Sequence, residues 1–146
     1  MSSCIDEVTA WMRSNQLQLN TAKTEFLWST TSRRLYQLPQ LPLRVGADHI
    51  SSASAVRDFG IFIDSDFLMR SHVAKTVLAC YSVLCQLRTI HRSLSRSVLQ
   101  SLVSSLVLSW LDYGNSTLTG VSSHVLSRLQ SVINAIARLI FSPSKF

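Results

Sequence analysis

The sequence predicts an α+β fold in which a mixed N-terminal part precedes three helices. With 146 residues and 47% hydrophobic content, the chain is long enough to bury a core. In the segments just before Asp66 apolar residues are spaced by about two positions, and beyond Asp66 by about 3.6. We therefore expect two parts, residues 1–66 with a helix and a few antiparallel strands, and residues 67–146 with a three-helix bundle.

The N-terminal part begins with a predicted amphipathic helix, because apolar residues recur there at intervals of three and four. These residues are Ile5, Val8, Trp11 and Met12. Residues 23–30 (KTEFLWST) alternate and contain aromatics, which predicts a strand. Residues 43–45 and 49–51 flank a predicted turn and suggest a short hairpin.

A stronger strand is predicted for residues 56–63 (VRDFGIFI), where Gly60 indicates a bulge or a close backbone approach. Three helical segments follow, at residues 71–92, 95–111 and 122–141. The second is apolar over the widest arc, so we expect it to be the most buried. Ser71 is a candidate cap for the first segment, and Pro143 should end the third. Short connections predict antiparallel neighbours.

Charge is distributed unevenly between the two parts. Residues 1–68 hold six basic and seven acidic residues, whereas residues 69–146 hold eight basic residues and one acid, Asp112. The C-terminal part therefore carries a net charge of +7. A surface that contacts phosphates requires such a balance, because each neutralised phosphate releases counterions. The alternative is a basic surface that serves solubility alone.

Several classes of protein find little support in the sequence. Three cysteines without a C-x-x-C pair argue against a disulfide framework and a zinc site, and no metal site is predicted. No secretory signal is evident, and the longest uncharged stretch, residues 97–111, is too short and too polar to span a bilayer. We expect an intracellular protein of the nucleus or cytoplasm, without a membrane partner.

Four motifs in a fixed order carry a resemblance to a known family. They are WMRSNQLQLNTAKTEFL, VRDFGIFIDSDFLMRSHV, LVSSLVLSWLDYGNSTLTG and LSRLQSVINAIARLI. From about Ile5 to the C-terminus, the chain resembles the reverse transcriptases (RNA-directed DNA polymerases) of non-LTR (LINE-type) retrotransposons. The motif WLDYGNSTLTG has Gly114 where the family commonly has Cys.

The resemblance implies that residues 1–66 are the C-terminal remnant of a palm and residues 67–146 a thumb. The matching palm segment follows the catalytic Y-x-D-D or F-x-D-D turn of the family, whose acids bind Mg²⁺. This chain has no counterpart of those acids, so we expect it to bind no cofactor and to show no polymerase activity alone. The expected partner is the RNA/DNA template–primer duplex of the parent enzyme.

Lys23, in LNTAKTEF, matches the motif D lysine of the family, which implies a general acid toward the departing pyrophosphate. The alternative is a solvated lysine at the start of a strand. Thr21 and Ala22 stand where the family usually has Pro and Asp.

Residues 56–63 resemble the primer grip, which implies a tight hairpin in this part of the palm remnant, with Arg57 and Gly60 as the expected contacts to nucleic acid. For Phe59, Ile61 and Ile63, packing in a core is the favoured interpretation.

Asp64 and Asp66 have the spacing of a metal-binding pair, but the resemblance places them in the turn before the first thumb helix.

In the thumb-like part, the resemblance implies contact with duplex phosphates and 2′-hydroxyls through a group of basic residues. These are Lys75, Arg88, Arg92, Arg96, Arg128 and Arg138. Two alternatives remain open. The chain could be a non-catalytic nucleic-acid-binding module, or an interaction protein that self-associates or binds a partner through exposed apolar helix faces.

Overall fold

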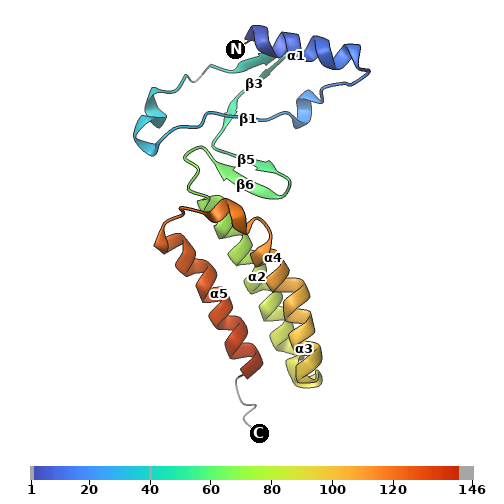
Figure 1. Ribbon diagram of the computed structural model, residues 1–146, viewed down its shortest axis with the longest axis vertical. Coiled ribbons are helices and arrows are strands. Elements are labelled where there is room, and N and C mark those ends of the chain that lie inside the picture. Colours follow the sequence, from blue (N-terminus) through green and yellow to red (C-terminus); the bar gives the residue numbers. More distant parts are fainter. Residues whose placement is uncertain (1, 40, 142–146) are drawn as a thin grey trace. The chain divides into compact units, whose positions relative to one another are not determined.

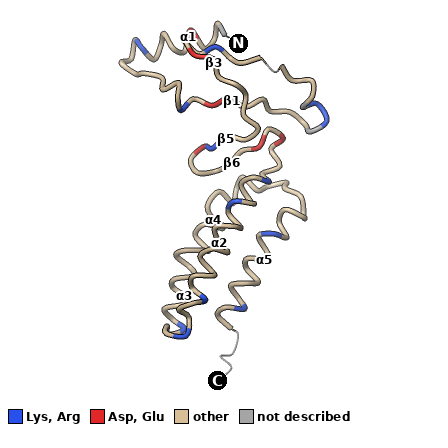
Figure 2. Tube along the Cα trace, turned by 180° about the vertical axis from the view of Figure 1, so that it is seen from behind, with Lys and Arg blue, Asp and Glu red and all other residues tan. Residues whose placement is uncertain are grey.

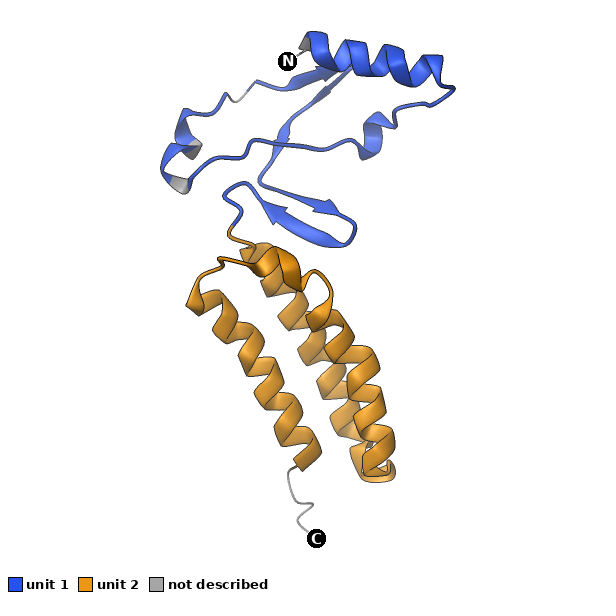
Figure 3. Cartoon of the chain, viewed as in Figure 1, with its two compact units in different colours: residues 1–67 blue, residues 68–146 orange. Residues whose placement is uncertain are grey.

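A computed structural model describes residues 2–39 and 41–141 as two compact units, Met1–Phe67 and Leu68–Phe146 (Figure 3). The first unit combines one helix with short strands, and the second is helical (Figure 1). The predicted α+β class is confirmed.

The first helix, α1 (Ser2–Ser14), ends in a Schellman turn. The N–H of Leu17 donates to the carbonyl of Met12 at 2.8 Å, and the N–H of Gln16 donates to the carbonyl of Arg13 at 3.1 Å. Gln16 therefore occupies the left-handed position, with φ 58°, that glycine usually fills. The turn satisfies carbonyls at the end of the helix and sends the chain back along it.

The inward face of α1 differs in part from the predicted one. Ile5, Thr9 and Met12 are half-buried, in accord with an i, i+4, i+7 stripe. Val8 and Trp11, which were predicted to share that face, are exposed, and Trp11 is 62% exposed. The apolar arc of α1 is thus wider than the surface that the rest of this unit offers to it.

The strand predicted for residues 23–30 is shorter in the structure. Residues Thr21–Lys23 form a 3₁₀ turn that Asn20 caps, and only β1 (Phe26–Leu27) is extended in a ladder. β1 pairs in parallel with β4 (Ser52–Ala53), so the prediction of antiparallel strands is wrong for this pair. A second 3₁₀ segment, Ser32–Gln37, lies in the stretch that leads to the first hairpin.

The hairpin predicted with strands at residues 43–45 and 49–51 is present as β2 (Leu43–Val45) and β3 (Asp48–Ile50), and its second strand begins one residue earlier than predicted. Gly46 begins its two-residue turn with φ +64°, a conformation that glycine adopts without steric cost. The Arg44 side chain on β2 donates to the Asp6 carboxylate at 2.9 Å. This ion pair joins the hairpin to α1.

The single strand predicted for residues 56–63 is wrong. The segment is a hairpin of β5 (Ala55–Asp58) and β6 (Ile61–Asp64) with Phe59 and Gly60 at the turn. Both turn residues have positive φ, 44° and 86°, as a type I′ turn requires. Phe59, predicted to pack in the core, is instead 87% exposed at the tip.

The helical unit consists of three helical runs joined by short turns (Figure 1). The first is α2 (Arg70–Ile90), which a 3₁₀ turn at His91–Ser93 follows. The second comprises α3 (Arg96–Val103), a π-helical segment (Ser104–Leu108) and α4 (Ser109–Asp112). After a 3₁₀ turn at Asn115–Leu118, α5 (Ser123–Phe141) completes the unit. Neighbours in sequence are antiparallel, so α2 and α5 run in the same direction.

The core of this unit lies between α2, the second helical run and α5. Its most deeply buried side chains are small, namely Val73, Cys80, Val103, Val107 and Val132. The Tyr81 hydroxyl donates to the Ser131 hydroxyl at 3.1 Å and links α2 to α5.

The second helical run is not the most buried, contrary to the prediction. It buries Leu99, Val103 and Val107, whereas α2 buries six residues. Its second apolar stripe, which includes Val98, Leu106 and Trp110, remains exposed, and Trp110 is 49% exposed. The described part of this unit does not cover this stripe.

The helix ends match the prediction in part. The second helical segment was predicted to begin at Ser95, and Ser95 caps α3 by accepting a hydrogen bond from the N–H of Val98 at 3.4 Å. Ser71 is not the cap of α2, because the helix begins at Arg70 and Met69 stands at the cap position in the left-handed conformation. Pro143, predicted to end the last helix, lies outside the described residues.

Among the described residues, the stretch Arg70–Ser93 has the length and the mean hydropathy, 1.2, of a helix that could cross a membrane. This is weak evidence, because a core helix of a bundle passes the same test.

Candidate nucleic-acid interface

Three of the predicted arginines lie around the turn that joins α2 to α3. Arg88 is in the last turn of α2, Arg92 is in the 3₁₀ turn, and Arg96 is the first residue of α3. All three side chains are exposed. Figure 2 shows basic positions at this turn.

The end of α5 reaches the same end of the bundle. The Arg96 guanidinium carbon lies 4.7 Å from the centre of the Phe141 ring, the last residue of α5. Arg138 is three residues before Phe141, so it lies on a neighbouring part of the same helix end. We call Arg88, Arg92, Arg96 and Arg138 the arginine corner.

Two predicted residues do not belong to the arginine corner. Lys75 and Arg128 lie in the second turns of α2 and α5. Because these helices run in the same direction, both residues are near the opposite end of the bundle. The structure thus divides the predicted basic group into a cluster of four and two separate positions.

The formal charge of the side chains at the arginine corner is positive. Asp112, the one acid of residues 69–146, ends α4 and is therefore far along the bundle from the start of α3. The N-terminal end of α3 favours anions at the corner, whereas the C-terminal ends of α2 and α5 disfavour them, so the arginine side chains supply the positive charge. Arg88 and Arg138 have a structural effect as well, since bases in a last helical turn stabilise the helix.

Hydroxyl groups surround the arginines at this corner. The Ser95 and Ser97 hydroxyls lie 3.0 Å apart, and the Thr89 hydroxyl donates to the Gln86 carbonyl at 2.7 Å. The His91 Nδ1 atom is 2.7 Å from the Arg88 carbonyl. Exposed hydroxyls beside guanidinium groups suit contacts with phosphates and with 2′-hydroxyls.

In the first unit, Lys23 ends the 3₁₀ turn before β1, and its side chain is exposed. Its backbone N–H donates to the Asn20 side-chain oxygen at 3.2 Å, so the turn is held by its cap. The structure places the ammonium group in solvent.

Arg57 and Gly60 lie on the β5–β6 hairpin. Arg57 pairs across the ladder with Phe62, and its guanidinium carbon is 5.7 Å from the centre of that ring. Gly60 lies in the turn, and the turn requires the positive φ of 86° that Gly60 adopts. The stacking fixes the direction of the Arg57 side chain and leaves its edge donors exposed.

Asp64 ends β6, and Asp66 lies in the turn that follows, where the N–H of Phe67 donates to the Asp64 carbonyl at 2.9 Å. Asp66 lies in the predicted turn, whereas Asp64 is part of the strand and not of the turn. Within residues 2–39 and 41–141, no group of three or more His, Cys, Asp or Glu side chains is arranged to hold a metal ion.

Two features of the structure were not predicted. The first is the contact between Phe141 and Arg96. In the sequence, Phe141 was one of several apolar residues at the end of the last helix, and no specific role was predicted for it. The second is a cavity of about 480 Å³ in the first unit that includes Arg13 among its lining residues. Its walls are far apart in the sequence, so no local pattern signalled it.

Comparisons with models of protein families, with curated protein sequences and with solved structures find no match for this chain. The resemblance to non-LTR reverse transcriptases therefore rests on the four sequence motifs alone.

Proposed function

We propose that this chain contacts the sugar-phosphate backbone of an RNA/DNA template–primer duplex through the arginine corner, as the palm-end and thumb portion of a non-LTR retrotransposon reverse transcriptase. The observation that carries the proposal is the convergence of Arg88, Arg92, Arg96 and Arg138 at one end of a unit whose one acid ends α4. The four ordered motifs support the family.

The chemistry of the arginine corner favours backbone contact over base reading. Guanidinium groups form paired hydrogen bonds with phosphate oxygens, and their positive charge displaces counterions from the duplex. Arg96 is stacked on Phe141, which orients its donors before any ligand binds. Contacts of this kind hold a duplex in position without regard to its sequence.

The proposal assigns no catalytic step to this chain. The family's metal-binding acids have no counterpart among these residues, and Mg²⁺ would belong to the parent enzyme. The proposed place of the exposed Lys23 is beside the pyrophosphate of that larger active site, where its ammonium group would donate a proton.

The decisive experiment measures duplex binding by fluorescence anisotropy at several salt concentrations, with the full chain and an RNA/DNA hybrid. The double variant R88A/R92A should reduce the slope of log K against log salt by about 2, since one phosphate contact contributes a slope of about 1. The double variant R33A/R34A removes two exposed bases of the other unit and should leave the slope unchanged. R88K/R92K should also retain it.

Identical slopes for R88A/R92A and R33A/R34A would contradict the proposal, provided that circular dichroism shows the α-helical content to be intact. That check is needed because Arg88 also stabilises the end of α2.

A second candidate function is favoured by the exposed apolar stripe on the second helical run. Val98, Leu106 and Trp110 are exposed there. Such a surface would bind another protein or a second copy of this chain. Sedimentation that depends on protein concentration, is insensitive to salt, and is abolished by L106S/W110S would favour it over the duplex.

A further inference from the structure

We propose that the first unit binds a small organic carboxylate in the cavity between α1, residues 16–21 and the β2–β3 turn, with Arg13 as the cationic anchor. This site is separate from the arginine corner and does not rest on the proposed contact with nucleic acid.

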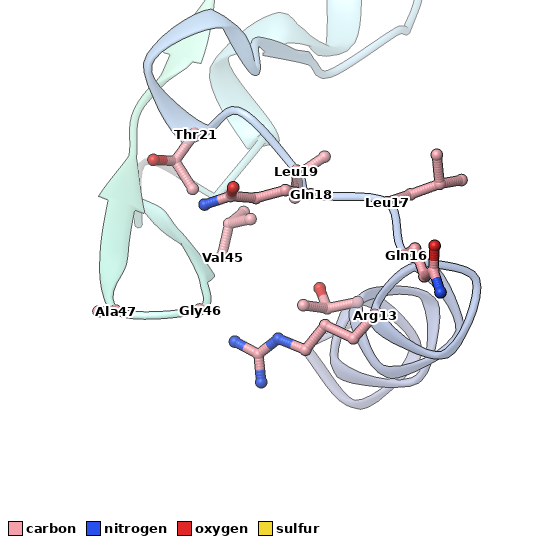
Figure 4. Close-up of a pocket in the computed structure, with 10 residues that line it drawn as sticks. Arg13, Gln16, Leu17, Gln18, Leu19, Thr21, Val45, Gly46 and Ala47 are labelled. Atoms are coloured by element: carbon pink, nitrogen blue, oxygen red, sulfur yellow. The ribbon is translucent and has the colours of Figure 1, made fainter.

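The cavity has a volume of about 480 Å³, which is within the usual range for small-molecule sites. The end of α1 forms one wall, the returning chain forms a second, and the hairpin turn closes one side (Figure 4). Its lining consists of Thr9, Arg13, Gln16, Leu17, Gln18, Leu19, Thr21, Val45, Gly46 and Ala47. In Figure 4, Val45 lies between the Arg13 guanidinium and the Gln18 amide.

Arg13 is the one charged residue among the described residues that line the cavity. Arg44, on the same hairpin, is paired with Asp6, but Arg13 has no ion pair or side-chain hydrogen bond within the described part of the chain. A guanidinium offers five donors in a planar fork that matches a carboxylate. The lining thus carries one formal positive charge, on a group that suits a planar anion.

The C-terminal end of α1 repels an anion less than an uncapped helix end would. The Met12 and Arg13 carbonyls accept hydrogen bonds from the N–H groups of Leu17 and Gln16. Because the Schellman turn satisfies these carbonyls, fewer unpaired oxygens face a ligand near Arg13.

The remaining lining favours an organic ligand over an inorganic ion. Val45 is 3% exposed and forms an apolar surface, to which Leu19 adds. On the far side from Arg13, the Gln18 amide and the Thr21 hydroxyl can bind a second polar group. The arrangement fits a ligand with a carboxylate at one end, an apolar middle and a hydroxyl or carbonyl at the other.

The walls of the cavity are held in place before any ligand binds. The Arg44–Asp6 ion pair, at 2.9 Å, joins the hairpin to α1, and the Schellman turn fixes the returning chain. At Gly46, an added Cβ would meet nothing within 4 Å, so the rim is open there. Fixed walls with an open rim lower the entropic cost of binding, because few side chains and loops have to be ordered when a ligand enters.

The test titrates the full ¹⁵N-labelled chain with 4-hydroxybenzoate and, in parallel, with 4-hydroxybenzamide, which has the same shape without the charge. We expect saturable shifts of the backbone amides of Gln18, Thr21 and Gly46 with the acid, and binding at least about tenfold weaker with the amide. R13Q should remove this preference, R13K should retain part of it, and R33Q should have no effect.

Equal binding of the acid and the neutral amide would overturn the proposal, as would unchanged binding of the acid by R13Q. Shifts that do not saturate, or that spread over both units, would also overturn it. The spectrum of unliganded R13Q establishes that the variant is folded, so a loss of binding reports on the guanidinium itself.

Discussion

The guanidinium of Arg96 lies over the ring of Phe141, with 4.7 Å between its central carbon and the ring centre. The contact joins the start of α3 to the end of α5, whose sequence positions are 45 residues apart. Arg138, three residues before Phe141, therefore lies at the same end of the bundle as Arg88 and Arg92. A cation on a ring face also keeps its N–H groups at the edge free for other acceptors.

This contact should contribute measurably to the stability of the helical unit. Phe141 is 63% exposed, so we expect a coupling free energy between Arg96 and Phe141 of about 0.5–1 kcal/mol. Urea unfolding of R96A, F141A and the double variant gives this value as a double-mutant cycle. The cycle of Arg92 with Phe141 is the matched control and should give a coupling near zero. Equal couplings in both cycles would refute the stacking as a specific interaction.

The end of α1 offers a stabilising substitution. Gln16 adopts φ 58°, where a side chain meets the backbone and glycine does not. We expect Gln16→Gly to raise the free energy of unfolding by roughly 1 kcal/mol. Gln18→Gly, outside the left-handed region, should instead lower it slightly or leave it unchanged. Denaturant unfolding measures both, and a lower stability for Gln16→Gly would contradict the assignment of the Schellman turn.

The three cysteines should differ in reactivity. Cys80 is fully buried, and burial raises the pKa of its thiol, whereas Cys4 and Cys85 are exposed. Because the thiolate is the reactive form, a disulfide reagent such as DTNB should modify Cys4 and Cys85 in the folded chain and Cys80 only after unfolding. Mass spectrometry of the modified chain checks this. Equal rates at Cys80 and Cys85 would show that the core is open to solvent.

The same thiol predicts how stability depends on pH. In the unfolded chain the Cys80 thiol ionises near its ordinary pKa of 9.0, whereas burial keeps it protonated to higher pH in the folded chain. The folded state thus binds the proton more tightly, so the free energy of unfolding should fall as pH rises above that value. Cys80→Ala removes this contribution, and its stability should decline less over the same range. Parallel pH profiles for both proteins would contradict the prediction.

We expect no incorporation of deoxynucleotides by this chain on primed RNA with Mg²⁺, because two-metal phosphoryl transfer needs carboxylates that the resemblance assigns to another part of the parent enzyme. A primer-extension assay with a complete reverse transcriptase as positive control measures this. D64N/D66N is the informative variant. Incorporation that this variant abolishes would make the two aspartates catalytic and would overturn the proposed division of roles.

The predicted helices agree with the structure where one face packs against a partner. α2 and α5 begin and end within two residues of the predicted ranges. The error in burial arose in the second helical run, whose apolar arc is wider than the contact with α2 and α5. The spacing of apolar residues shows which faces of a helix can be buried. It does not show how many neighbouring helices are present to bury them.

Strands were harder to predict, because the alternation continued through a turn. In VRDFGIFI, Phe59 read as part of the apolar stripe, although it is one of two turn residues with positive φ. The common Asn-Gly and Asp-Gly signals are absent there, so the turn had only Gly60 to mark it.

The candidate sites were also difficult to predict, because their residues are far apart in the sequence. The excess of basic residues in the C-terminal part was visible in the sequence, but the separation of Lys75 from Arg92 and the approach of Arg138 to Arg96 depend on helix direction and packing. The cavity beside Arg13 joins the end of a helix to a hairpin turn near Val45. Residues this far apart in a chain carry no shared local pattern.

The most direct measurement of the central claim is the affinity of the unmodified chain for an RNA/DNA hybrid between about 50 and 200 mM salt. If the arginine corner engages four phosphates, a plot of log K against log salt should fall with a slope of roughly −3 to −4. A slope near zero, or no binding at micromolar protein in the lowest salt, would contradict the account.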